Sequence, residues 1–223
     1  MDKITELYRN LSAPSHKNSY LISFEGIEGS GKSTQINYLK DHFEAQNYRV
    51  LLLREPGGTD FGEGLRSQIL NSSVPINPIA EAYLFASSRA QLLSEKVLPF
   101  LEQQKSIVIL DRFIDSSLAY QGIARDIGFE KILKIHQLPP LNTIPHITFY
   151  LKIDLKTSFE RQKSRGSEKD YFEKENAKFY GQLVEGYDTS AKYFPERVIV
   201  IDASKTVEEV SLDIRTKVSD KIS

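Results

Sequence analysis

The chain has no cysteine among its 223 residues. It therefore forms neither disulfides nor thiolate metal sites, and its composition is compatible with a reducing compartment. It also lacks a run approaching the roughly 20 apolar residues that span a bilayer, and residues 1–20 lack the continuous apolar stretch of a signal peptide. We therefore expect a cytoplasmic protein without a membrane partner.

Net charge is also nearly absent, at −1. Such a balance gives no overall attraction to nucleic acid or anionic lipid, so we expect no nucleic-acid partner. The length suits one domain with a small appended lid. The four histidines match no metal-ligand spacing: His16, His42, His136 and His146.

Residues 26–33 fit the P-loop pattern of glycine, four residues, glycine, lysine, then serine or threonine. Glycines let the backbone aim N–H groups at an anion, and the helix that follows adds its positive dipole end. Lys32 would place a charge on the outer phosphates, and the Ser33 hydroxyl would complete a magnesium shell. An ordinary glycine-rich turn is the alternative. The motif predicts a phosphate site over Gly26, Ile27, Glu28, Gly29, Ser30, Gly31, Lys32, Ser33 and Thr34.

Short apolar runs alternate with helical patterns along the chain. The run at residues 49–53 is continuous, which is typical of a strand covered on both faces of a parallel sheet. Strands are also expected at 20–25, 107–110, 146–151 and 198–201, and helices at 32–46, 61–70, 79–102, 155–164, 171–192 and 207–222. This alternation predicts a doubly wound α/β fold with a five-stranded parallel sheet flanked by helices.

The two ends of the main domain are also predicted. Residues 4–11 fit a short amphipathic helix, and residues 12–18 read as a linker. We therefore expect an N-terminal extension over 1–18 and a single domain over 19–223. The basic helix end and polar loop at 161–172 suit a short lid that closes over phosphates, although a solvated turn would look the same.

Charged residues follow the predicted strands. Asp111 ends a buried strand, where a carboxylate can hold magnesium or one of its waters, although such aspartates also cap helices. Arg54 and Arg112 each follow directly on a buried strand, and an arginine fork suits bidentate contact with phosphate. Surface arginines are usually solvated, but this placement favours a ligand with several phosphates. Further candidates are Arg89, Arg161 and Arg165.

Taken together, five segments resemble the thymidylate kinase family, and its bacterial type in particular. The likeness extends from about residue 19 to about residue 213. It is far more specific than the P-loop because it rests on the order of residues 26–33, 54–59, 85–89, 111–113 and 116–122.

The resemblance implies a kinase that uses ATP and Mg²⁺ to phosphorylate dTMP to dTDP, and that forms a homodimer. Arg54 and Arg112 would grip the dTMP phosphate, Phe85 would stack on thymine, and Arg89 would bond a base carbonyl. Glu28 would contact the sugar or a magnesium water. The remaining acceptor-site residues would be Ser116, Ser117, Tyr120 and Gln121, of which Tyr120 would crowd the position of a ribose 2′-hydroxyl.

One position distinguishes a subtype of the family. Some members carry an arginine inside the P-loop, where this chain has Gly29. The lid would then supply the catalytic charge beside Lys32 and Arg112, through Arg161 or Arg165. Bacterial lids often have a basic residue directly after the lid aspartate, but Asp170 is followed by Tyr171, so the choice between the two arginines stays open.

Two other functions stay open at this point. Another nucleoside monophosphate kinase would act on dUMP, CMP or AMP. A nucleotide-sensing P-loop regulator would bind without turnover, but it has no evident need for the acceptor-site residues Arg54, Phe85, Arg89 and Tyr120.

Overall fold

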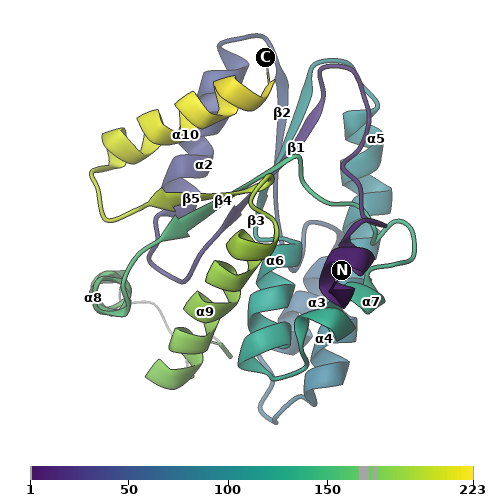
Figure 1. Cartoon of the computed structure of the whole chain (residues 1–223), viewed down its shortest axis with the longest axis vertical. Coiled ribbons are helices and arrows are strands. Elements are labelled where there is room, and N and C mark those ends of the chain that lie inside the picture. The colour runs from purple at the N-terminus through teal and green to yellow at the C-terminus, as the bar shows by residue number, and fades with distance from the viewer. Residues whose placement is uncertain (1, 166–170, 173–174, 223) are drawn as a thin grey trace.

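The computed structural model describes residues 2–165, 171–172 and 175–222. The loop of the expected lid, residues 166–170, lies outside this range. Within the described residues, five strands form one parallel sheet in the order β2-β3-β1-β4-β5 (Figure 1). They are β1 Tyr20–Glu25, β2 Arg49–Arg54, β3 Ser106–Asp111, β4 Ile147–Lys152 and β5 Val198–Asp202. The predicted doubly wound α/β fold is confirmed.

Helices cover both faces of this sheet. Figure 1 shows α2 Lys32–Glu44 and α10 Val207–Ile222 on one face, and α9 Ala177–Tyr193 and α6 Ile114–Ser117 on the other. The other helices are α1 Lys3–Tyr8, α3 Asp60–Leu70, α4 Pro78–Leu92, α5 Leu98–Leu101, α7 Phe129–Ile135 and α8 Leu155–Arg165, with π-helical segments η1 Leu93–Val97 and η2 Leu118–Ala124.

The structure differs from the predicted pattern at three places. β2 was expected to be covered on both faces, but it lies at the sheet edge, and its side chains are half-buried or exposed. The long helix expected at 79–102 is interrupted by η1. The helix expected from residue 171 begins only at Ala177, because the Asn176 side chain caps it by accepting from the Phe179 N–H at 3.0 Å.

The N-terminal extension packs on the domain. Its helix α1 contacts α7, and the Tyr8 ring stacks on Phe194 with centroids 4.0 Å apart. The Tyr8 hydroxyl accepts a hydrogen bond from Arg197 Nε at 3.0 Å. Arg197 in turn forms a buried ion pair with Asp115, with Nη1 2.7 Å from the carboxylate. The first residues of the chain are therefore connected to α6, which carries part of the predicted site.

The same substitution at two glycines of α9 should change the free energy of unfolding in opposite directions. A Cβ on Gly186 would lie 2.5 Å from the Ala119 Cα of η2, whereas Gly181 has nothing within 4 Å. Gly186→Ala is expected to lower the free energy of unfolding by about 1–3 kcal/mol through overpacking. Gly181→Ala should raise it by about 0.5–1 kcal/mol. Urea unfolding of both variants tests this, and equal effects would contradict the close approach of α9 to η2.

Candidate active site

The P-loop joins β1 to α2 at the carboxyl edge of the sheet. Gly26 has φ +138°, and a Cβ there would lie 2.6 Å from the Leu151 carbonyl oxygen, so the turn requires glycine. Lys32 is buried, and its Nζ donates to the carbonyl oxygens of Gly26 at 3.1 Å and Ile27 at 3.5 Å. Burial and the nearby Arg112 charge lower the pKa of Lys32 from its usual value.

A polar cavity opens beside this loop. Its wall joins the P-loop to the ends of β2 and β3, and it brings together Glu28, Gly29, Gly31, Lys32, Ser33, Arg54, Glu55, Arg66, Asp111 and Arg112. The cavity brings together Lys32, Ser33, Asp111 and the two strand-end arginines Arg54 and Arg112, and the roles predicted for them from sequence stay predictions. Cations and backbone N–H groups in one cavity suit a chain of phosphates.

The residues that would hold magnesium fit that ion. The Asp111 Oδ1 atom is buried and has no hydrogen-bond partner within the described residues, and Ser33 lines the same cavity. Among these residues, no cluster of three or more histidine, aspartate and glutamate side chains could form a complete metal site. This donor set suits a hard cation that keeps several waters and shares the nucleotide phosphates.

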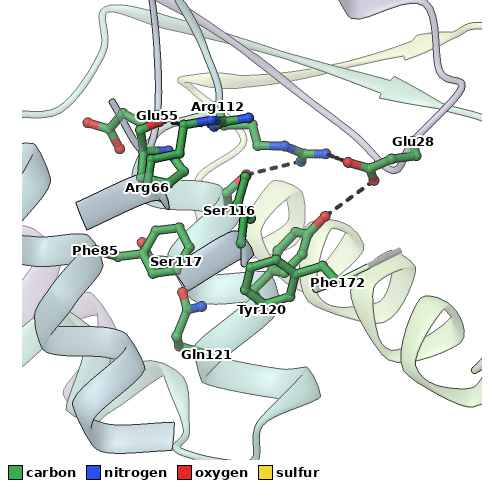
Figure 2. Close-up of a pocket in the computed structure, with 12 residues that line it drawn as sticks. Glu28, Glu55, Arg66, Phe85, Arg112, Ser116, Ser117, Tyr120, Gln121 and Phe172 are labelled. Atoms are coloured by element: carbon green, nitrogen blue, oxygen red, sulfur yellow. Dashed lines mark hydrogen bonds and ion pairs between the residues drawn. The ribbon is translucent and has the colours of Figure 1, made fainter. Parts of the chain in front are cut away.

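A second pocket adjoins the first and is more apolar (Figure 2). The two share Glu28, Glu55, Arg66 and Arg112, which therefore lie at their junction. The remaining lining residues are Pro56, Leu70, Phe85, Ser116, Ser117, Tyr120, Gln121 and Phe172.

Aromatic rings form one wall of this pocket. Phe172 meets Phe85 edge-on at 6.0 Å and Tyr120 at 5.3 Å, measured between ring centroids. Gln121 Nε2 donates to the buried Glu81 carboxylate at 2.8 Å, while its Oε1 has no partner within the described residues. A flat apolar slot with one unused acceptor suits a planar base that offers an N–H group.

Arg112 stands at the junction in a strained backbone conformation, with φ +72°. Its Nη2 donates to Glu28 Oε1 at 2.5 Å, and its guanidinium lies over the Tyr120 ring, 5.3 Å from the centroid. Burial of the Glu28 carboxyl favours its neutral form, but the charges of Arg112 and Lys32 outweigh burial and hold the pKa of Glu28 below its usual range. Glu28 and Arg112 thus form a charged pair at the junction.

The two other predicted substrate arginines occupy very different surroundings. Arg54 lies at the exposed rim of the polar cavity, where Nη2 donates to Glu63 at 2.9 Å. Arg89 is 1% exposed and lies behind the pocket wall. Its Nε donates to Glu55 at 2.8 Å, and its Nη1 lies 3.0 Å from Ser117 Oγ and 2.7 Å from His136 Nε2. Its direct contact with a base stays a prediction.

His136 gives this buried cluster a measurable pH dependence. Burial and the Arg89 charge lower the pKa of His136 to about 3 from 6.5, so the fold excludes a proton that the unfolded chain binds. Stability is therefore lost as pH falls below about 6.5, by about 2 kcal/mol at about pH 5. Urea unfolding at about pH 7.5 and about pH 5 tests this. Between these two values, the free energy of unfolding of the wild type should fall by about 2 kcal/mol more than that of His136→Gln. Equal losses would contradict a neutral His136.

The two predicted lid arginines belong to α8. Arg161 Nη1 donates to the carbonyl oxygen of Gly29 at 3.0 Å, and its guanidinium also reaches the Ala203 carbonyl oxygen at 3.4 Å. In this arrangement Arg161 joins the P-loop to the segment after β5. The side chain of Arg165 lies outside the described residues, so its role stays a prediction.

Several pocket residues were missed from sequence. Arg66 lines both cavities, and its Nη1 donates to the Pro56 carbonyl oxygen at 3.0 Å. Glu55 and Phe172 also line the second pocket, and Tyr187 contacts Arg112. Arg66 lies one turn after Glu63, within a helix that directly follows a site motif, and this placement is the only signal that could have singled it out.

Comparisons with known proteins agree with this geometry. The thymidylate kinase family model matches residues 24–214. A thymidylate kinase of Thermoanaerobacter sp. (strain X514) is 45% identical over 194 residues, covering 86% of this chain and 94% of that protein. One from Mycoplasmopsis pulmonis is 42% identical over 200 residues, 87% of this chain and 85% of that protein.

Structure and sequence give the same family. The crystal structure of thymidylate kinase from Ehrlichia chaffeensis superposes with a TM-score of 0.72 at 30% identity, covering 90% of this chain and 99% of that one. Among the described residues, none of the helices is both long and apolar enough to traverse a bilayer. On this evidence the chain is a member of the thymidylate kinase family.

Proposed function

We propose that this chain transfers the γ-phosphoryl group of ATP to the phosphate of dTMP, giving dTDP. One observation carries the proposal: Arg112 lines both the P-loop cavity and the aromatic pocket, so its guanidinium would hold an acceptor phosphate next to the donor triphosphate. The P-loop side suits the donor triphosphate. The aromatic side suits a nucleotide whose base enters between Phe85 and Gln121 and whose phosphate reaches Arg112.

Alignment and charge neutralisation supply most of the catalysis. The acceptor phosphate is already largely ionised near neutral pH, so the reaction needs no strong general base. Lys32 would exchange its P-loop carbonyl partners for the outer phosphates of ATP, while Arg112 would hold the acceptor in line. Magnesium, held by Ser33 and Asp111, would neutralise charge on the transferring group. Arg161 or Arg165 would add the lid charge.

The acceptor pocket, lined by Phe85, Ser117, Tyr120 and Gln121 among others, can distinguish thymine from cytosine, whose ring N3 carries no hydrogen. The Gln121 Oε1 atom would accept the N–H of the base, Phe85 would stack on it, and Ser117 would lie beside it. Tyr120 would restrict the space at the sugar 2′ position. A base without the matching N–H would leave the Gln121 oxygen buried and unpaired, which is how such a site rejects analogues. At the phosphate end, the candidates are Arg54, Arg66, Arg112 and Ser116, while Glu28 would contact the sugar or a magnesium water.

A substrate panel tests the proposal. Initial rates would be measured with ATP, Mg²⁺ and one of dTMP, dUMP, UMP, CMP, AMP or GMP, each with an EDTA control. We expect dTMP to give the highest kcat/KM and EDTA to abolish turnover. A clear preference for another nucleotide would favour the rival kinase, and inactivity with all of them would favour a sensor.

The resemblance also supports a homodimer in the cytoplasm. Three large apolar side chains are exposed on the adjoining helices α3 and α4: Phe61 at 52%, Ile79 at 45% and Tyr83 at 57%. Ile79 and Tyr83 are four residues apart on α4 and share a face, and exposed apolar side chains on one face suit a protein interface. Analytical ultracentrifugation tests this, since a monomer at micromolar concentration would exclude the dimer.

A further inference from the structure

The guanidinium of Arg112 donates to protein groups through Nη1 and Nη2, while its Nε is left for a ligand. Nη1 donates to the Gly26 carbonyl oxygen at 3.0 Å and to the Tyr187 hydroxyl at 2.9 Å, and it lies 3.4 Å from Ser116 Oγ. Nη2 donates to Glu28. Within the described part of the chain, Nε has no recorded acceptor. The Nε and Nη2 hydrogens on one side form the fork that grips two oxygens of a phosphate.

The groups behind Nη1 form a hydrogen-bond chain with one direction. Because arginine only donates, the Tyr187 oxygen accepts from it and gives its own proton to Ser116 Oγ, 2.8 Å away. Ser116 then donates to Glu25 Oε2 at 2.6 Å. Glu25 also accepts from the Phe113 N–H at 2.8 Å. Burial raises the pKa of Glu25 to about 7; when Glu25 is ionised, its buried carboxylate ends the chain and both hydroxyls donate towards it.

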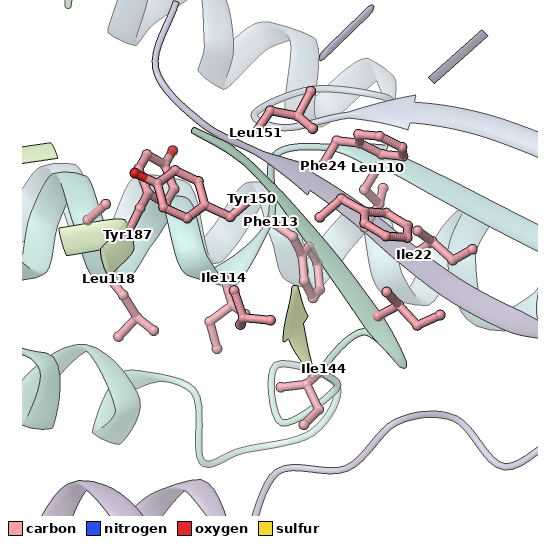
Figure 3. Close-up of a cluster of buried hydrophobic side chains, with 14 of the residues drawn as sticks. Ile22, Phe24, Leu110, Phe113, Ile114, Leu118, Ile144, Tyr150, Leu151 and Tyr187 are labelled. Atoms are coloured by element: carbon pink, nitrogen blue, oxygen red, sulfur yellow. The ribbon is translucent and has the colours of Figure 1, made fainter. Parts of the chain in front are cut away.

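Packing fixes the position of the Tyr187 hydroxyl. The ring is 1% exposed and stacks on Tyr150 of β4, with centroids 5.2 Å apart and planes at 26°. Figure 3 shows the two rings side by side. Its helix α9 contacts η2 closely at Gly186, next to Tyr187 in the sequence. The position of the hydroxyl is therefore fixed by packing against the sheet and by α9. This position in turn determines where Nη1 of Arg112 can lie.

We propose that Tyr187 is a positioning residue for phosphoryl transfer, acting through Arg112. It holds the Nη1 edge, so that the Nε and Nη2 edge faces the acceptor phosphate in line with the P-loop, and Glu25 orients the connecting hydroxyls. This inference rests on the function proposed above. It adds a contribution from α9, a helix outside both cavities, and no motif in the sequence predicted it.

Tyr187→Phe in the full-length protein tests the inference, because it removes only the hydroxyl and keeps the stacked ring. We expect kcat/KM for dTMP to fall about tenfold, less than the roughly 10²-fold cost of a 1 Å misplacement, with KM for ATP within about twofold. Tyr150→Phe is the matched control: it alters the same stack, but its hydroxyl bonds Asp188. It should leave both nucleotides' kinetics unchanged.

A double-mutant cycle separates positioning from general destabilisation. If Tyr187 acts through Arg112, Tyr187→Phe should have no further effect on dTMP kinetics in an Arg112→Ala background. Ser116→Ala, which breaks the same chain, should reproduce part of the loss. Wild-type dTMP kinetics in folded Tyr187→Phe, an equal loss in both backgrounds, or an equal rise of KM for ATP would overturn the inference alone. A wild-type protein inactive with dTMP would overturn the proposed function as well.

Discussion

Arg112→Ala is expected to lower kcat/KM for dTMP by about 10³-fold while the Kd for ATP changes by less than about threefold. The reason is geometric. The guanidinium lies at the junction of the two cavities. Its loss removes the partner of Glu28 and would remove the proposed contact with the acceptor phosphate. The donor nucleotide keeps the P-loop N–H groups and Lys32. Steady-state kinetics and ATP titration by calorimetry measure the two quantities.

Arg112→Lys provides a graded comparison. A lysine restores the charge but not the planar fork, so we expect activity between those of the wild type and the alanine variant. Near-normal kcat/KM in Arg112→Ala would refute the role assigned to this residue. An equal loss of ATP affinity would instead place Arg112 on the donor nucleotide.

Arg197→Met is expected to lower the free energy of unfolding by about 3–5 kcal/mol, because it leaves the Asp115 carboxylate buried without its cation. Arg197 is 5% exposed and Asp115 is 1% exposed. Burial alone would raise the pKa of Asp115, but the Arg197 charge and hydrogen bonds outweigh burial and lower it. The variant keeps the stem packing, but it removes the charge partner of Asp115 together with the hydrogen bonds to Tyr8 and Thr148. Denaturant unfolding at neutral pH provides the measurement.

Lys152→Met is the matched control for that experiment. Lys152 Nζ lies 2.7 Å from Asp188, the same separation as in the buried pair, but its side chain is 44% exposed. An exposed pair of this kind contributes about 0–1 kcal/mol. Similar losses in Arg197→Met and Lys152→Met would show that burial does not set the energetics of the Arg197 pair.

Local sequence patterns predicted the alternation of elements but not their arrangement. The apolar run of β3 and the P-loop before α2 carry strong short-range signals, and both are found where expected. The apolar run of β2 looks equally buried in sequence, yet β2 is an edge strand. Strand order depends on crossovers that apolar periodicity does not encode, so this edge could not be identified from the run itself.

The residues of the candidate site likewise fall into those that local sequence patterns predicted and those that they did not. Motif residues such as Lys32 and Asp111 were predicted because each lies at the end of a strand or loop with a recognisable pattern. Tyr187 was not predicted, because it meets Arg112 from 75 positions away in the sequence. The burial of Arg89 was also hidden, since it depends on Glu55 and His136 from separate segments. Long-range packing decides which polar residues reach the pocket.

Gly29 occupies the P-loop position at which a catalytic arginine could otherwise be placed. Its φ is +78°, and a Cβ there would lie 3.1 Å from the Ser158 carbonyl oxygen and 3.2 Å from the Arg161 Cβ. An arginine at this position alone would strain the backbone and press on α8 before it could reach a phosphate. Any side chain at position 29 is therefore coupled to α8, because the backbone of that helix must shift by a few tenths of an ångström to accommodate it.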